Sequence, residues 1–358
     1  MNERERFLET VRFGKPDRPP YWEDLREATL NRWRSEGMPR NVNVTEFFGL
    51  DARISLPVNL GLLPRFEEKV LWEDDRYRIW IDSSGAKRKD FKVNLTPGFV
   101  TRTWLEFPVK AREDFLKVKE RYNARDPKRY PKDWAKRAQS LRRRKVPLQT
   151  TIYGGFWWVR DLMGLTQLSL TLHREPDFFT EMVDFSVDFQ LETLHRALDT
   201  IDLDFVFLSE DMAYKAGPMI SPATTRRFLL PGYKRISKFL RDHGVASIIV
   251  DCDGNMESLI PVWMEAGFDG VHPCEAAAGV NPVEMRRKYP RLVLSGGIDK
   301  REISKSTEEI DKEIFSKVPP LVKTGGYLPH IDHGVPSDIS FRNYLYYRQT
   351  LRETCEKD

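Results

Sequence analysis

The chain has 358 residues, of which 40% are hydrophobic, 31% charged and 12% aromatic, with a formal net charge of +4. This composition is that of a globular protein and excludes a disordered chain. The small net charge speaks against nucleic acid as a partner, and no apolar run reaches the roughly 18 residues of a membrane span. The three cysteines are widely spaced, and the first residues lack the apolar stretch of a signal peptide. We therefore expect a cytoplasmic protein that contacts neither membrane nor nucleic acid.

The first 145 residues lack a regular strand–helix rhythm. Apolar spacing predicts a short amphipathic helix over 3–13, ended by consecutive prolines, and a second helix over 25–37. Residues 66–91 alternate apolar and polar side chains between turn signals, which predicts an antiparallel meander. Residues 112–144 are highly charged and indicate solvated helices. This part is therefore expected to be an N-terminal elaboration with an inserted meander.

From residue 146 to 358, apolar runs of strand length alternate with amphipathic stretches such as 222–243 and 307–322. This alternation is typical of βα units around a parallel sheet. The runs lie at 146–153, 204–208, 245–250, 270–272, 292–294 and 326–328, and two more strands are expected near Pro20 and over 53–57. Eight strands predict a (β/α)₈ TIM barrel of the α/β class, with residues 1–358 as one domain. A doubly wound sheet is the alternative, but no Gly-x-Gly-x-x-Gly motif follows any run.

Two carboxylates follow one of these strands. Asp251 and Asp253 come directly after the run 245–250, and residues two apart in an extended chain point to the same side. Carboxylates this close repel each other unless a cation or a proton lies between them, so the pair indicates a metal site or an acid–base site. The structural alternative is a strand-to-helix turn in which Gly254 makes the bend and Asn255 caps the next helix.

The loops after two later strands contain three of the six histidines of the chain, His272, His330 and His333. A histidine at a strand end is a candidate metal ligand or proton donor, and a structural histidine is the alternative. Glu275 follows His272 closely. It is either a functional acid or a residue at the start of a helical turn, where the helix dipole favours an acid.

Another strand end carries Glu210, Asp211 and Lys215 after the run 204–208. These residues either form a surface group of ion pairs or line a pocket at the barrel mouth.

Aromatic side chains follow the run 146–153. Gly154 and Gly155 would let the backbone approach a ligand closely. Tyr153, Trp157 and Trp158 are candidates to wall a flat ring, and packing at the barrel rim is the alternative.

With these loops placed, the chain resembles the uroporphyrinogen decarboxylase superfamily over nearly its whole length. The resemblance is carried by several motifs in matching order, among them Arg-Glu-Arg-Phe-Leu at 4–8, Pro-Asp-Arg-Pro-Pro at 16–20, Val-Asp-Cys-Asp-Gly-Asn at 250–255 and Gly-Gly-Ile-Asp at 296–299. The superfamily includes the decarboxylase itself, methylcobalamin:coenzyme M methyltransferases and corrinoid-dependent O-demethylase methyltransferases. The resemblance implies a distorted (β/α)₈ barrel with an N-terminal elaboration.

Two departures separate the chain from the true decarboxylases. Their arginine-rich segment, which grips substrate carboxylates, corresponds to residues 21–28, where only Arg26 is retained. Their aspartate on an early strand corresponds to Asn59, which lacks the acceptor-only carboxylate that would bind pyrrole N–H groups. The zinc ligands of the coenzyme M enzymes, a His-x-Cys pair and a later cysteine, correspond to Asp251, Asp253 and His333, an oxygen-rich set. The chain is thus expected to lie closer to the corrinoid-dependent methyltransferases, of the O-demethylase or methylcobalamin type, than to the true decarboxylases.

The resemblance implies a metal-assisted methyltransferase that moves a methyl group from a small methoxylated aromatic donor to the cobalt of a corrinoid on a separate carrier protein. A divalent metal, with zinc as the expected ion, would be held by Asp251, Asp253, Glu275 and His333. The expected catalytic residues are Asp253, His333, Glu210 and Asp211. The expected substrate-binding residues are Tyr153, Trp157, Trp158, Lys215, His272, Tyr327 and His330.

Alternatives stay open at this point. One is a metal-free decarboxylase in which Asp253 or Glu275 donates a proton and His333 orients it. Another is a protein that binds a corrinoid or a ring without turnover. Exposed carboxylates without shifted pKa values would favour it, since catalytic carboxylates should have shifted pKa values. His272 is an alternative to Glu275 as the fourth ligand, and a homodimer is left open.

Overall fold

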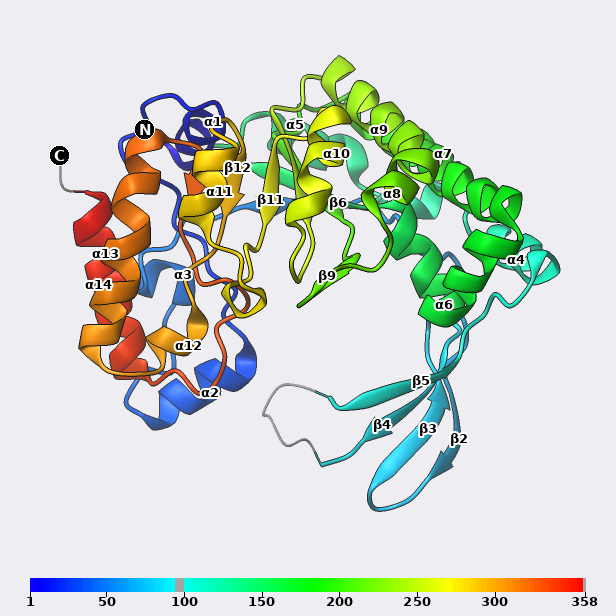
Figure 1. The fold of residues 1–358 in the computed structure, drawn as a ribbon, viewed down its shortest axis with the longest axis horizontal. Coiled ribbons are helices and arrows are strands. Elements are labelled where there is room, and N and C mark those ends of the chain that lie inside the picture. The colour runs from blue at the N-terminus through cyan, green and yellow to red at the C-terminus, as the bar shows by residue number, and fades with distance from the viewer. Residues whose placement is uncertain (94–99, 357–358) are drawn as a thin grey trace.

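The computed structural model describes residues 1–93 and 100–356. Within these residues, a parallel sheet has seven strands in the order β1-β6-β7-β10-β11-β12-β13. They are β1 (Ile54–Ser55), β6 (Leu148–Tyr153), β7 (Phe205–Ser209), β10 (Ser247–Asp251), β11 (Gly270–His272), β12 (Val293–Ser295) and β13 (Tyr327–Leu328). The sheet curls into a half-barrel (Figure 1), so the expected distorted barrel of the α/β class is confirmed.

The expected eighth strand near Pro20 is wrong. Residues 19–24 form no ladder, and Leu25 makes only an isolated parallel bridge with Val335. Pro19 and Pro20 have no N–H group to donate, which prevents regular pairing here.

The same segment nevertheless joins the two edges of the sheet. Its Tyr21 carbonyl accepts a hydrogen bond from the amide of Asp51, just before β1, and its Asp24 carbonyl accepts one from the amide of Val335, after β13. An irregular segment therefore takes the place of the missing strand.

Helices α6 to α14 follow the strands of the sheet in the chain, with α7 and α9 at the upper right of Figure 1 and α13 and α14 at its left. They are α6 (Gly155–Arg174), α7 (Pro176–Leu198), α8 (Pro222–Phe228), α9 (Leu230–Asp242), α10 (Ile260–Glu265), α11 (Pro282–Lys288), α12 (Lys300–Ile303), α13 (Thr307–Thr324) and α14 (Phe341–Cys355). The N-terminal part adds α1 (Glu3–Val11), α2 (Glu27–Ser35), α3 (Val44–Phe47), α4 (Arg112–Lys119) and α5 (Trp134–Arg142). Among the described residues, no helix combines the length and apolar character needed to cross a membrane.

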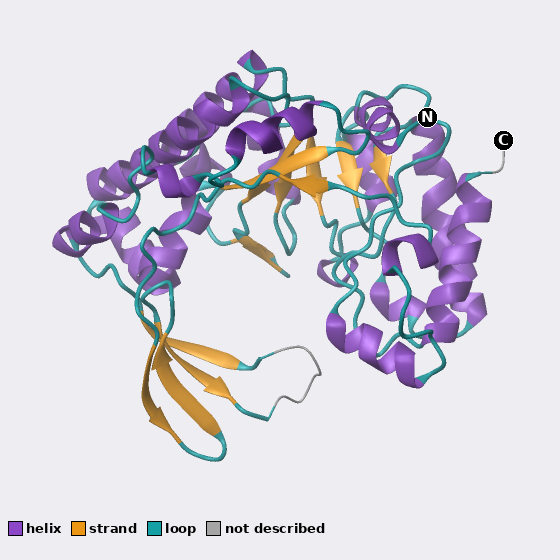
Figure 2. Ribbon diagram, turned by 180° about the vertical axis from the view of Figure 1, so that it is seen from behind, coloured by secondary structure: helices purple, strands orange, loops and turns teal. Residues whose placement is uncertain are grey.

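The expected meander is a four-stranded antiparallel sheet. It contains β2 (Lys69–Glu73), β3 (Tyr77–Ile81), β4 (Lys87–Phe91) and β5 (Arg102–Glu106), paired in that order. Both views show a C-shaped molecule in which the barrel is the back, the meander is one arm, and α2 and α12 lie in the other (Figures 1 and 2). The hairpin of β8 (Ala213–Tyr214) and β9 (Gly217–Pro218), which follows β7, lies inside the C. The carboxyl ends of the strands thus face the open side.

The inside of the barrel has an apolar layer at its amino end. Alternating positions of four strands supply Phe205, Phe207, Ile249, Val293 and Leu328, and these pack with Phe7 and Val11 of α1 and with Trp22. Since residues two apart in a strand share a face, the next inward positions toward the carboxyl ends are Ser209, Asp251, His272, Ser295 and His330. The strand register aligns three of these, Ser209, Asp251 and His272, in one row. The alternation therefore places a polar layer directly above an apolar one.

Candidate active site

A cavity of about 250 Å³ lies at the carboxyl ends of the strands. It is lined by the segment that joins the sheet edges, by the residue before β1, and by the loops after β10, β11 and β13: Trp22, Glu23, Asp24, Arg26, Arg53, Asp251, Asp253, His272, Pro273, His330, His333 and Gly334. Five residues expected at the site share this cavity, namely Asp251, Asp253, His272, His330 and His333.

Asp251 ends β10 and points inward. Burial raises its pKa to about 7, and the nearby carboxylates of Asp253 and Asp211 act in the same direction. Burial and Asp253 also raise the pKa of Asp211. Three acids therefore influence one another at this edge, so a proton or a cation among them would relieve their repulsion.

His333 links the acids of two loops. Its Nε2 lies 3.1 Å from Oδ1 of Asp253, and its Nδ1 lies 2.9 Å from Nζ of Lys300. Burial alone would lower the pKa of His333, but its interactions with Asp253 and with the buried Asp332 outweigh burial and raise it to about 9. Because an ammonium group can only donate, the contact with Lys300 belongs to the neutral ring. In the imidazolium, Nδ1–H would face Oδ1 of Asp332, 3.7 Å away, while Nε2–H donates to Asp253 in both states.

A chain of hydrogen bonds determines the tautomer of His272. Nδ1 of His330 donates to the carbonyl of Ile331 at 2.6 Å, because a carbonyl can only accept. Burial lowers the pKa of His330 to about 4, so the ring is neutral and its Nε2 accepts from Oγ of Ser295 at 2.8 Å. Oγ of Ser295 in turn accepts from Nδ1 of His272 at 3.1 Å. Burial also lowers the pKa of His272, so Nε2 of that ring carries a lone pair.

The donor types of this cavity fit a divalent cation. Two carboxylates, Asp251 and Asp253, share it with the Nε2 lone pair of His272 and with His333, and such mixed oxygen and nitrogen sets hold zinc and similar ions. These atoms are not gathered as closely as ligands around an ion. Over residues 1–93 and 100–356, three potential ligand atoms lie within 4.8 Å of one another only in the group of His195, Asp199 and His243, which lies elsewhere.

Glu275 does not line the cavity. Its Oε2 accepts a hydrogen bond from the amide of Gly254 at 2.8 Å. Gly254 has φ +81°, and a Cβ there would lie 2.6 Å from the backbone nitrogen of Tyr214. Glu275 thus secures the tight loop that carries Asp253, and only its other oxygen remains for a metal.

Glu210 turns away from the cavity into the protein. Its oxygens accept hydrogen bonds from the amides of Phe156 (3.0 Å) and Trp157 (2.8 Å), at the start of α6, and from the hydroxyl of Tyr233. A Cβ at Gly154 would lie 2.2 Å from Cδ of Glu210, so glycine is needed for this approach. Burial raises the pKa of Glu210 to about 7 despite these donors. The arrangement holds α6 against β7 and α9.

The remaining expected residues also lie outside the cavity lining. Asp211 accepts from the amide of Asp253 at 3.2 Å and faces Arg160 at 3.5 Å, so it supports the loop of Asp253. Lys215 is exposed at the turn between β8 and β9. Tyr327 is buried and donates to the carbonyl of Gly296 at 3.0 Å.

The aromatic residues after β6 divide between two other cavities. Tyr153 and the buried Trp158 line one of about 270 Å³, where the Trp158 ring packs 5.2 Å from that of Tyr122. Trp157 lines one of about 510 Å³ together with Trp104 of the meander. These rings do not wall the cavity of Asp251 and His333.

Arg53 and Lys300 are site residues that the sequence patterns did not indicate. Arg53 precedes β1, and its guanidinium lies 5.0 Å from the ring of Trp22 and 5.9 Å from that of Phe207. A charged residue at an inward position of a predicted strand is a signal that could have pointed to it. Lys300 contacts residues more than 30 positions away, so no local pattern predicts its role.

Acids and imidazoles lie together at the carboxyl ends of the parallel strands, which is where enzymes with β/α barrels have their active sites. A family model described as uroporphyrinogen decarboxylase (URO-D) matches residues 103–354, which is more than half of the chain. The chain therefore belongs to the uroporphyrinogen decarboxylase family, as expected. No curated protein matches it. A solved methyltransferase from Methanosarcina mazei is similar with a TM-score of 0.59 and 14% identity, over 99% of this chain and 98% of that chain. At this identity the likeness shows the fold alone.

Proposed function

We propose that this protein is a methyltransferase that takes a methyl group from a small methoxylated aromatic donor and passes it to the cobalt of a corrinoid on a separate protein. The observation that carries the proposal is the Asp253–His333 pair beside Asp251 in one small cavity at the carboxyl ends of the strands. The likeness in fold to the M. mazei methyltransferase agrees with it.

The size of the cavity limits the donor. A volume of about 250 Å³ is below the roughly 300–1,000 Å³ of pockets for drug-sized ligands, so it suits a single substituted ring and not a tetrapyrrole. The indole of Trp22 supplies an apolar wall for such a ring. This volume favours a small donor over the substrate for which the family is named.

The residues of the chain suit the cleavage of an aryl methyl ether. When the O–CH₃ bond breaks, the methyl group leaves and both bonding electrons stay on the phenolate oxygen, which needs a positive charge or a proton. His333, with its pKa raised to about 9, is protonated at neutral pH, and its Nε2–H, which points to Asp253, would be shared with that oxygen and donated to it as the bond breaks. Asp253 orients the ring, and Asp332 faces the Nδ1–H on its other side.

A metal would take the place of this proton. On loss of the Nε2 proton, His333 would hold a divalent cation together with Asp251 and Asp253, with Glu275 or His272 as a fourth ligand, and zinc is the proposed ion. Such a cation would supply Lewis acidity to the leaving oxygen. The corrinoid would supply the nucleophile that accepts the methyl group, and its carrier would approach from the open side of the C, between the meander and the arm of α2 and α12.

Arg53 favours a donor that carries a negative charge. Over the described residues, its guanidinium has no hydrogen bond or ion pair, although it lines the cavity between the rings of Trp22 and Phe207. A guanidinium remains charged at every relevant pH and binds carboxylates through two parallel hydrogen bonds. A carboxylate on the aromatic ring would be held at Arg53, just before β1, while Asp251 faces the cavity from the end of β10 and His333 from the loop after β13.

The test uses the purified full chain with chemically reduced cobalamin as the acceptor and 3-methoxybenzoate as the donor. We expect methylcobalamin and 3-hydroxybenzoate in equal amounts, and loss of both products in Asp253→Ala. Metal content measured by mass spectrometry should fall by about one equivalent in the same variant. Absence of methylcobalamin with a panel of methoxylated rings, together with CO₂ release from carboxylated rings, would overturn the proposal in favour of a decarboxylase.

A further inference from the structure

We propose that His195, Asp199 and His243 form a second metal site, for a divalent transition metal such as zinc, on the side of the barrel away from the candidate active site. His195 lies in the last turn of α7, Asp199 ends that helix, and His243 ends α9. One potential ligand atom of each lies within 4.8 Å of those of the other two. The chain leads from α7 into β7 and from α9 into β10, so the site lies at the amino ends of these strands.

The first pair is set by helical geometry. His195 and Asp199 are four residues apart and therefore lie on the same face of α7. Nδ1 of His195 lies 2.8 Å from Oδ2 of Asp199. A metal ion would displace the proton of this contact, and the two exposed side chains, whose atoms are 2.8 Å apart, would separate to the roughly 3–4 Å of neighbouring zinc ligands.

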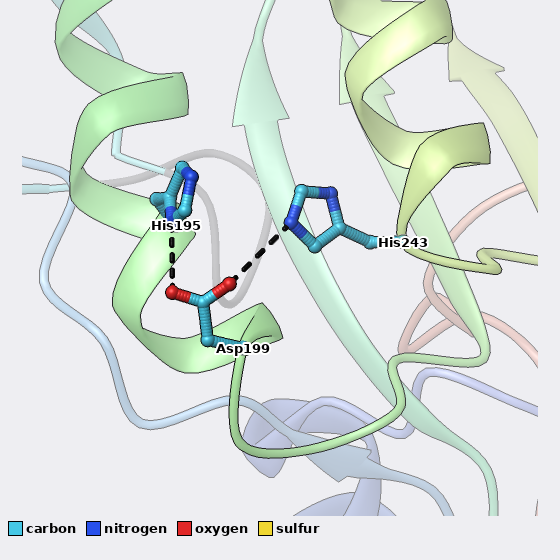
Figure 3. A group of neighbouring side chains, drawn as sticks. All are labelled: His195, Asp199 and His243. Carbon is cyan, nitrogen blue, oxygen red and sulfur yellow. Dashed lines mark hydrogen bonds and ion pairs between the residues drawn. The ribbon is translucent and has the colours of Figure 1, made fainter.

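His243 supplies the third donor with its lone pair already directed. Its Nδ1 lies 2.7 Å from the carbonyl of Phe239, which can only accept, so this nitrogen carries the proton. Nε2 of the neutral ring therefore has a lone pair, and it lies 3.9 Å from Oδ1 of Asp199. Figure 3 shows the two imidazoles turned toward opposite oxygens of the carboxylate. A backbone acceptor on the other ring nitrogen is the usual partner of a metal-binding histidine.

The distance of 3.9 Å is too long for a hydrogen bond but suits two ligands of one ion. Zinc ligands lie about 2.0–2.2 Å from the metal, so neighbouring ligand atoms are roughly 3–4 Å apart. Two nitrogens and one oxygen favour zinc, cobalt, nickel or copper over magnesium and calcium, which prefer oxygen.

Two further features favour a cation here. Both helices end at the site, and the carbonyl groups at a helix C-terminus carry partial negative charge. The side chains of His195 and Asp199 are 61% and 52% exposed, so an ion can enter from solvent, whereas His243 is 18% exposed and held in place. A bound ion would join α7 to α9 and stabilise the amino end of the barrel.

The site is separable from the candidate active site by mutation. The full chain, stripped of metal with a chelator, is titrated with Zn²⁺ and, in parallel, with Co²⁺, whose visible absorption reports nitrogen ligands. The background is Asp253→Ala, which disables the other cavity. We expect about one equivalent bound in this background, and an affinity about tenfold or more weaker after adding His243→Gln. His173→Gln, at an exposed histidine of α6, is the matched control and should leave binding unchanged.

His195→Gln repeats the test at an exposed position, in case His243→Gln does not fold. Zn²⁺ should also raise the unfolding temperature of Asp253→Ala but not that of its His195→Gln derivative. Zinc binding that is equal with and without His195 and His243 would overturn the proposal. Equal competition by Mg²⁺ would also overturn it, because it would indicate only attraction of any cation to the carboxylate.

Discussion

Nε2 of His333 donates a hydrogen bond to Oδ1 of Asp253 across 3.1 Å, and this contact joins the loop after β13 to the loop after β10. The two residues are 80 positions apart in the chain. The contact makes the protonation of the ring depend on the aspartate, because a nearby carboxylate stabilises the imidazolium.

Asp253→Asn should therefore lower the pKa of His333 from about 9 toward its ordinary value of about 6.5. We expect activity at pH 7 to fall about fourfold from the lost protonation alone, since a pKa of about 6.5 leaves roughly a quarter of the His333 rings protonated. NMR titration of the His333 ring measures the pKa, with the exposed His173 as an internal reference. The fold should be retained, because the Asp253 side chain is half exposed. An unchanged His333 pKa in this variant would show that the contact does not control the ring.

Glu210→Ala should destabilise the protein rather than remove a catalytic group. The change leaves the amides of Phe156 and Trp157 and the hydroxyl of Tyr233 without their acceptor in a buried place. The expected loss in the free energy of unfolding is about 2–4 kcal/mol, measured by denaturant titration. Glu210→Gln, which keeps an acceptor oxygen, should lose less. A stable Glu210→Ala protein without activity would instead support the catalytic role that its position after a strand suggested.

Arg53→Gln should change which donors are used. Losing a charge-assisted contact worth about 1.5–3 kcal/mol corresponds to a KM roughly 10–100-fold higher for a donor with a carboxylate. Neutral methoxybenzene should be affected little. The measurement is the ratio of kcat/KM for 3-methoxybenzoate and methoxybenzene in the two proteins. A parallel loss with both donors would mean that Arg53 supports the cavity and does not read the charge.

Acid should destabilise the protein through His330. Its pKa is about 4 in the folded chain because of burial, and about 6.5 when unfolded. Below pH 6.5 the unfolded chain takes up a proton that the folded chain does not, so stability is complete above pH 6.5 and falls as the pH decreases to about 4. The difference in pKa corresponds to about 3 kcal/mol. Denaturant titrations across this range should show that the free energy of unfolding falls less steeply with decreasing pH in His330→Gln than in the wild type. Ser295→Ala, which keeps His330, is the control. Equal slopes in wild type and His330→Gln would contradict the prediction.

Much of the fold follows from patterns within short segments. The runs at 245–250 and 270–272 correspond to β10 and β11 because apolar stretches of strand length between turns have few other uses. The strand near Pro20 was wrong because its place is set by backbone contacts with Asp51 and Val335, which no local pattern reports.

The parallel sheet and the acids and histidines at its strand ends follow from local sequence patterns, because alternation along a strand sets which side chains point inward. The surroundings of each of these side chains depend on contacts between distant segments. Asp253 lines a cavity and meets His333, whereas Glu210, also at a strand end, is enclosed by α6 and Tyr233. The position of a residue in a strand is a local property, but its partners come from distant segments, and those partners set its charge and its role.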